Sequence, residues 1–148
     1  MKFTLSVLAL LFSFNTFAVV ATGNVFYLIP QRNEIVKRDM SLSVPARGEG
    51  DVVLISSSGS ETKATSFWTE EDHGRKVFHV FFDALRNPTD PNSETISMLF
   101  VGTYMRGGNL AAYYGDIYLG GTASTIEMAK TLNGFKHVGG FVFKSDIK

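Results

Sequence analysis

The chain of 148 residues contains no cysteine, and this absence excludes several structures and reactions at once. Disulfide bonds, thiolate metal sites, a lipid-modified N-terminal cysteine and a cysteine nucleophile are all ruled out. Small exported domains often depend on disulfides or metals for stability. A cysteine-free domain of this length must therefore be stabilised by a well-filled hydrophobic core.

The chain also lacks an excess of charge of either sign. The chain has 14 Lys and Arg residues against 14 Asp and Glu residues, and no run of basic residues exceeds two. Such a balance provides no electrostatic attraction to a phosphate backbone or to an anionic membrane surface. We therefore expect no nucleic-acid partner.

Long apolar runs are missing except at the N-terminus. Met1-Lys2 is followed by an apolar stretch from Phe3 to Phe14 and by Thr16-Phe17-Ala18, the small-residue pattern of a signal-peptidase site. The apolar stretch is too short to span a bilayer, which needs about 20 residues. The sequence predicts a signal peptide at 1–18 and a single β-rich domain at 19–148, exported to a periplasm or outside the cell, with bacterial origin favoured. Cleavage after Ala21 and an uncleaved N-terminal anchor are the alternatives; after cleavage no transmembrane segment is expected.

Catalytic motifs are absent as well. The chain has no G-x-S-x-G, P-loop, dinucleotide-binding or H-E-x-x-H pattern. Ser60 and Lys63 match the S-x-x-K string of serine acyltransferases, but that chemistry requires a helix, and Gly59 and the strand-like segment 64–69 argue against one. We expect a protein that is not an enzyme, with an enzyme of unrecognised type as an alternative.

No metal or cofactor site is predicted. His73, His79 and His137 do not have the spacing of metal ligands. Asp90, Asn92 and Glu94 alternate as in calcium loops, but prolines interrupt them and the glycine that such a loop needs at its sixth position is missing. A loop joining two strands is the better interpretation.

The distribution of glycine, proline and alternating apolar residues predicts an all-β, mainly antiparallel fold of about seven or eight strands. The candidate strands are 24–29, 40–44, 51–56, 64–69, 76–85, 95–105, 109–119 and 137–144. The hairpin from 95 to 119 has apolar residues on both faces, so we expect a small β-barrel or a closed β-sandwich.

One short helix is predicted before the last strand. Ser124 to Glu127 forms a capping box, Ile126, Ala129 and Leu132 share one helical face, and Asn133-Gly134 provides a left-handed stop. Its position predicts a plug or lid at one end of the barrel or sandwich.

Aromatic residues with polar tips are the candidate ligand-binding groups, because their hydroxyl or N–H groups can orient a ligand. Asp116, between Tyr114 and Tyr118, is either solvated or buried and satisfied by a ligand or by Arg106; we favour the solvated face. Ordinary core packing is the alternative for all of them. The predicted site residues are Trp68, His79, Tyr104, Tyr113, Tyr114, Asp116 and Tyr118.

Together these features predict an exported, soluble β-domain with a non-catalytic binding role. The expected partner is a small apolar molecule, or a protein or glycan of the cell envelope. A structural or interaction protein with a fully packed core is the main alternative. A membrane-embedded barrel is a weaker one, since several candidate strands have five or six residues where about ten are required. An open cavity or a filled core would separate the first two classes.

Overall fold

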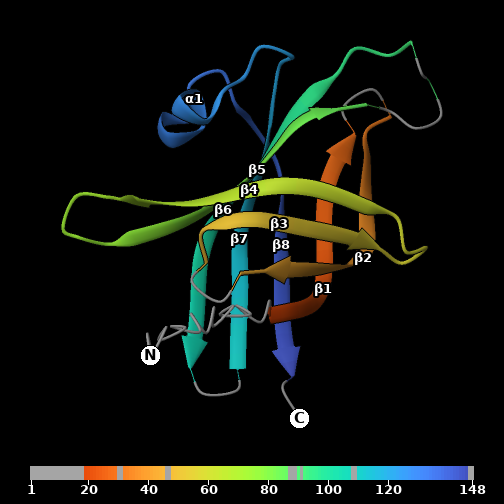
Figure 1. Ribbon diagram of the computed structural model, residues 1–148. Helices are drawn as coiled ribbons and strands as arrows, with labels where there is room; N and C mark the ends of the chain where they lie inside the picture. Colours follow the sequence, from red (N-terminus) through yellow and green to blue (C-terminus); the bar gives the residue numbers. More distant parts are fainter. Residues whose placement is uncertain are drawn as a thin grey trace, which may run out of the picture.

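The computed structural model describes residues 19–29, 32–45, 48–86, 90, 92–107 and 110–146, so the predicted signal peptide lies outside the described residues. These residues form eight strands and one helix (Figure 1). Their bounds are β1 Val19–Ile29, β2 Glu34–Val44, β3 Gly50–Ser56, β4 Glu61–Glu70, β5 Lys76–Leu85, β6 Ile96–Gly107, β7 Leu110–Gly120, α1 Ile126–Thr131 and β8 Lys136–Asp146.

The strands close into an antiparallel barrel in which each strand pairs with the next along the chain and β8 pairs with β1. The predicted all-β class, strand number and single helix before the last strand are confirmed, and of the two predicted architectures the barrel is correct. Closure pairs every strand on both sides, so apolar residues can point inward all the way round.

Several strands are longer than the sequence pattern predicted. β2 starts at Glu34, six residues before the predicted start at 40, and β1 starts at Val19 and not at 24. Residues 34–39 of β2 are largely exposed and charged, so they lack the alternation that indicates a strand. Their ladder to β1 nevertheless extends to the pair Ile29 and Glu34.

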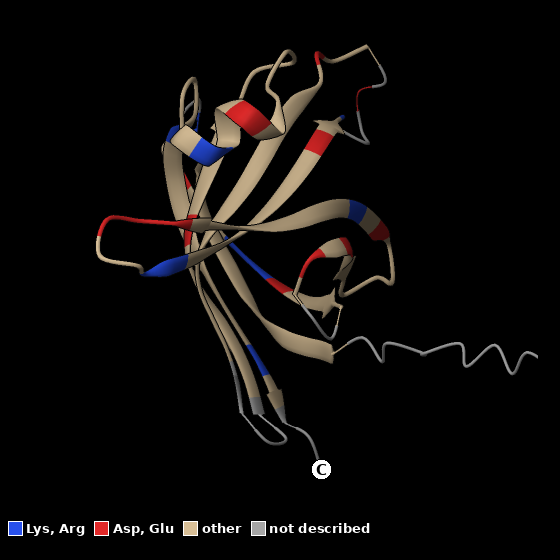
Figure 2. Ribbon diagram, turned by 60° about the vertical axis from the view of Figure 1, so that its left-hand side comes forward, with Lys and Arg blue, Asp and Glu red and all other residues tan. Residues whose placement is uncertain are grey.

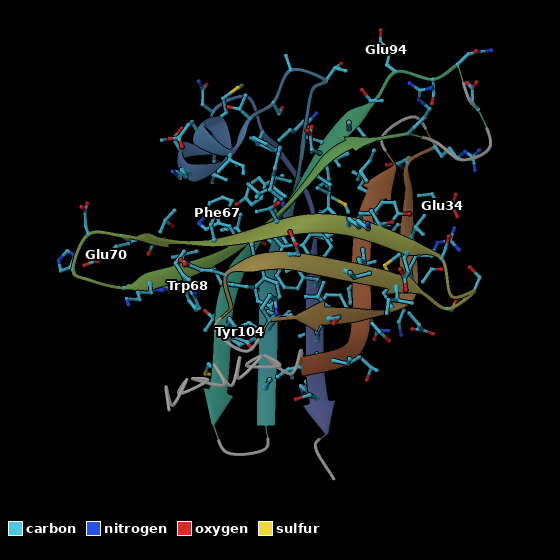
Figure 3. The ribbon with its side chains drawn as sticks, viewed as in Figure 1. Glu34, Phe67, Trp68, Glu70, Glu94 and Tyr104 are labelled. Carbon is cyan, nitrogen blue, oxygen red and sulfur yellow. The ribbon has the colours of Figure 1, made fainter. Side chains whose placement is uncertain are left out.

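Aromatic rings fill one half of the barrel interior. Phe78 lies 4.9 Å from both Tyr104 and Tyr113, centroid to centroid, and Tyr113 lies 4.4 Å from Phe141. Phe78, Tyr113 and Phe143 are almost completely buried. We call this part, built from Trp68, Phe78, Tyr104, Tyr113, Phe141 and Phe143, the closed half. Figure 3 shows Trp68 and Tyr104 at this end, away from Glu34 and Glu94 at the other.

Two glycines permit the close approach of β6 and β7. Gly102 and Gly115 are register partners, and a Cβ atom at Gly102 would lie 2.0 Å from the carbonyl oxygen of Tyr114. No side chain fits at that distance, so glycine is needed where these two strands approach so closely.

The helix α1 covers the outside of the barrel wall. Ala129 is fully buried against the outward-facing Phe81 and Leu99, with Ile126 and Leu132 beside it. The predicted apolar face is therefore correct, but the predicted role as a plug or lid at one end is not. The helix begins one residue later than the capping box indicated, because Thr125 is the N-cap and accepts a hydrogen bond from the Met128 N–H.

Charged residues cluster at turns and hairpin ends, and much of the barrel wall carries none (Figure 2). Among the described residues, no helix is long and apolar enough to cross a membrane.

Candidate functional site

An apolar cavity of about 230 Å³ opens into the half of the barrel opposite the closed half. Its walls come from six strands: the late part of β1 and β7, the early part of β6 and β8, and single residues of β2 and β3. The ten lining residues are Val25, Tyr27, Met40, Leu54, Ile96, Met98, Phe100, Ile117, Leu119 and Val138.

The depth of the cavity follows from the burial of its lining. Val25, Phe100 and Ile117 are at most 3% exposed, whereas Ile96 is 42% exposed. The first three therefore form the floor and Ile96 belongs to the mouth. Alternation along each strand produces this arrangement, because every second residue faces inward and most of the inward residues here are aliphatic.

No charged side chain lines the cavity among the described residues. Tyr27 carries the one hydroxyl group of the lining, and Met40 and Met98 contribute weakly polar, adaptable thioethers. Such a surface solvates a hydrocarbon well but cannot neutralise a carboxylate or an ammonium group.

Three of the predicted site residues lie inside the barrel, in the closed half. Trp68, Tyr104 and Tyr113 contact one another through Phe78 and do not line the cavity. Tyr113 is 1% exposed, and its hydroxyl donates to the carbonyl oxygens of Phe100 at 3.0 Å and Phe78 at 3.2 Å. Burial raises the pKa of Tyr113 well above its ordinary value. This tyrosine is satisfied by the protein itself and stabilises the closed half.

His79 lies on the opposite side of the wall, in the outer cluster of β4, β5 and β6. Its ring stacks on Phe67 with centroids 4.8 Å apart and planes 7° apart, and its Nε2 shares a hydrogen bond of 2.7 Å with the Thr69 hydroxyl. The residue is 3% exposed, and its Nδ1 atom has no hydrogen-bond partner among the described residues. Burial lowers the pKa of His79 to about 4, so the imidazole is neutral at pH 7.

The remaining predicted residues also face outward. Asp116 has 59% of its side chain exposed and pairs with His137 at 3.0 Å, which agrees with the solvated face that we favoured. Tyr118 packs edge-on to His137, and both burial and the Asp116 carboxylate raise its pKa. Tyr114 is 43% exposed. Arg106, the alternative partner of Asp116, lies opposite Ala111 in the ladder, and its side chain is outside the described residues.

The structure thus places three of the seven predicted residues inside the barrel and four on its outer face, and none of them lines the cavity. Sequence reasoning selected aromatic residues with polar tips, whereas the cavity is lined mainly by aliphatic residues. One signal in the sequence could have located the cavity. Apolar residues alternate at 25 and 27, at 96 and 98, and at 117 and 119, and these positions face inward at the same end of three strands.

Other candidate groups do not converge. No cluster of three or more His, Asp or Glu residues able to hold a metal occurs in the part of the chain that the structure describes. The Asp90 carboxylate accepts a hydrogen bond from the Asn92 N–H, as in an ordinary Asx turn. Ser60 precedes strand β4, so the S-x-x-K string is not helical.

Comparison of the chain with protein-family models, with curated proteins and with solved structures found no match.

Proposed function

We propose that this protein binds a small, neutral, apolar molecule in the cavity of its barrel and catalyses no reaction on it. The observation that carries the proposal is the contrast between the two halves of one interior. Six large aromatic side chains fill the closed half, whereas a lining made mainly of aliphatic and methionine side chains leaves about 230 Å³ in the other.

An unfilled apolar cavity is energetically unfavourable. Cavities in protein cores destabilise by about 24 cal/mol for each Å³, so a space of this size corresponds to a few kcal/mol, less whatever its opening to solvent recovers. Larger side chains at the lining positions would remove this cost, as they do in the closed half. A bound apolar ligand would remove this free-energy cost equally well, so the open half is suited to ligand binding.

The size and chemistry of the cavity restrict the ligand. Because a dry apolar cavity of about 150 Å³ admits benzene, 230 Å³ accommodates about nine non-hydrogen atoms at the same ratio. The absence of charge in the described lining favours neutral molecules, with Tyr27 available to one hydroxyl or carbonyl group. We also propose that residues 1–18 direct export, so that the ligand would be bound in a periplasm or outside the cell.

Isothermal titration of the purified protein with 1-octanol and with octanoate tests this function. We expect 1-octanol to bind with a Kd on the order of 10 to 100 µM, from roughly 0.8 kcal/mol for each buried methylene. Octanoate should bind at least about tenfold more weakly, because its carboxylate has no partner in the lining.

A matched pair of variants locates the binding. Val138→Phe places a ring in the cavity, whereas Val142→Phe makes the same change on the same strand at a residue that is 39% exposed. Val138→Phe should weaken the binding of 1-octanol at least about tenfold, and Val142→Phe should leave its Kd unchanged. Absence of 1-octanol binding to the unmodified protein, or equal binding by the two variants, would contradict the proposal.

A further inference from the structure

The ladder that closes the barrel stops short of the cavity mouth. β1 and β8 pair from Thr22 with Lys144 to Tyr27 with Gly139. Beyond that pair, β1 continues to Ile29 along β2, and β8 begins at Lys136 along β7. The two strands lean apart at this end (Figure 1). The β1–β8 seam is therefore unpaired beyond Tyr27 and Gly139, and we call this unpaired stretch the notch.

A second apolar hollow lies directly outside this notch. It is lined by Phe26, Tyr27, Leu28, Ile35, Val138, Gly139 and Gly140, and we call it the outer groove. Tyr27 and Val138 line both the cavity and the outer groove, so the two spaces adjoin at the notch. Gly139 and Gly140 present bare backbone as part of the groove floor.

The outer groove exposes apolar side chains that a soluble surface normally covers. Phe26 and Leu28 are each 39% exposed and Ile35 is 73% exposed. They come from adjacent strands, and Leu28 and Ile35 are register partners. A contiguous apolar patch of this kind indicates a binding surface. Because the outer groove adjoins the cavity, one ligand can occupy both. Its inner part would lie in the barrel and its outer part would cover the groove.

We infer that the ligand is an elongated neutral alkyl chain that enters tail first, passes through the β1–β8 notch and lies along the outer groove. This inference rests on the proposed binding function and extends it to the class of ligand. A chain longer than about nine non-hydrogen atoms exceeds the cavity. Its remaining methylenes would be transferred out of water and would pack on the groove formed by Phe26, Leu28 and Ile35.

The affinity of 1-alkanols as a function of chain length tests the path, with 1-hexanol, 1-octanol, 1-decanol and 1-dodecanol as probes. A methylene that leaves water completely lowers Kd about fourfold, and one that is half covered lowers it about twofold. Up to 1-octanol, the decrease in Kd for each added methylene measures binding in the cavity. From 1-octanol to 1-dodecanol, four half-covered methylenes in the outer groove should lower Kd by roughly a further 15-fold.

A double variant, Leu28→Ser with Ile35→Ser, removes the exposed apolar surface of the groove. Val20→Ser is the control, since Val20 is 53% exposed on the same strand and lines neither space. We expect the double variant to bind 1-octanol normally but to bind 1-dodecanol only within about twofold of 1-octanol. The control should retain the full increment.

The outcomes separate the two claims. A plateau after 1-octanol in the unmodified protein, or a 1-dodecanol increment that survives in the double variant, overturns the path through the notch and leaves the cavity function standing. Failure of every alkanol to bind overturns both.

Discussion

The ring of Phe100 stacks on the ring of Phe141, with centroids 4.7 Å apart and planes 16° apart. Phe100 lines the cavity and Phe141 does not, so this contact lies where the open and closed halves of the interior meet. Phe100 is completely buried, and its ring also packs against the ring of Phe82, with centroids 5.1 Å apart. The floor of the proposed binding site is therefore part of the main core.

Replacing Phe100 with alanine should destabilise the protein by about 3 to 5 kcal/mol, because a fully buried ring is lost and the cavity grows. Urea unfolding measures the change. Glu71→Ala, in an exposed turn, is the control and should lie within about 0.5 kcal/mol of the unmodified protein. Equal unfolding midpoints for the two variants would show that Phe100 is not a core residue.

Gly102→Ala should reduce stability by about 3 kcal/mol or more, or prevent folding, because its Cβ would meet the Tyr114 carbonyl oxygen at 2.0 Å. Gly121→Ala is the matched control, since a Cβ there meets nothing within 4 Å. Thermal unfolding followed by circular dichroism distinguishes the two. A Gly102→Ala protein as stable as Gly121→Ala would mean that β6 and β7 do not approach as closely as described.

Substitutions at Tyr113 and at Asp116 should differ in their effect on stability, although the two residues are only three positions apart. Tyr113→Phe removes a hydroxyl that donates to the carbonyl oxygens of Phe100 and Phe78, and should cost about 1 kcal/mol. Asp116→Ala breaks only the exposed pair with His137 and should change stability by less than about 0.5 kcal/mol. A large loss for Asp116→Ala in denaturant unfolding would indicate that its carboxylate has a structural role.

Stability should fall as the pH is lowered from 6.5 to 4, in part because of His79. Its pKa is about 4 in the folded protein and 6.5 when solvated, so within this window the unfolded chain binds a proton that the folded chain excludes. The loss from this residue is at most about 3 kcal/mol and is complete near pH 4.

The contribution of His79 is obtained by comparing the unfolding free energy of the unmodified protein with that of His79→Gln at pH 7 and at pH 4.5. The variant should lose less stability between the two values, whereas His73→Gln, in an exposed turn, should follow the unmodified protein. Parallel pH profiles for His79→Gln and the unmodified protein would show that His79 is accessible to protons when folded.

The fold was largely predictable because its signals are local. The apolar residues on both faces of 95–119 predicted a covered hairpin, and this segment forms β6 and β7, with one face in the core and the other partly beneath α1. The capping box and the spacing of Ile126, Ala129 and Leu132 predicted α1 and its buried face. The surface on which that face packs depends on contacts with Phe81 and Leu99, distant in the sequence, and could not be predicted.

The candidate site was less predictable, because a cavity is defined by missing volume. Each of Val25, Met98 and Ile117 is an ordinary core residue in its own strand, and only the closed barrel shows that their side chains border a cavity. Polar groups dominated the sequence-based selection because their chemistry is visible in one residue. His79 and Asp116 proved to lie on the outer face, where ring stacking accounts for the first and an exposed hydrogen bond to His137 accounts for the second.

Methyl NMR of the methionines shows whether an alkanol binds inside the barrel. Met40 and Met98 line the cavity, whereas Met105 is 52% exposed and Met128 belongs to α1. With 1-octanol bound, we expect intermolecular NOEs from the alkyl chain to the ε-methyl groups of Met40 and Met98 and none to those of Met105 or Met128. NOEs to Met105 or Met128 in place of Met40 and Met98, or no NOE to any methionine at saturating 1-octanol, would contradict binding inside the barrel.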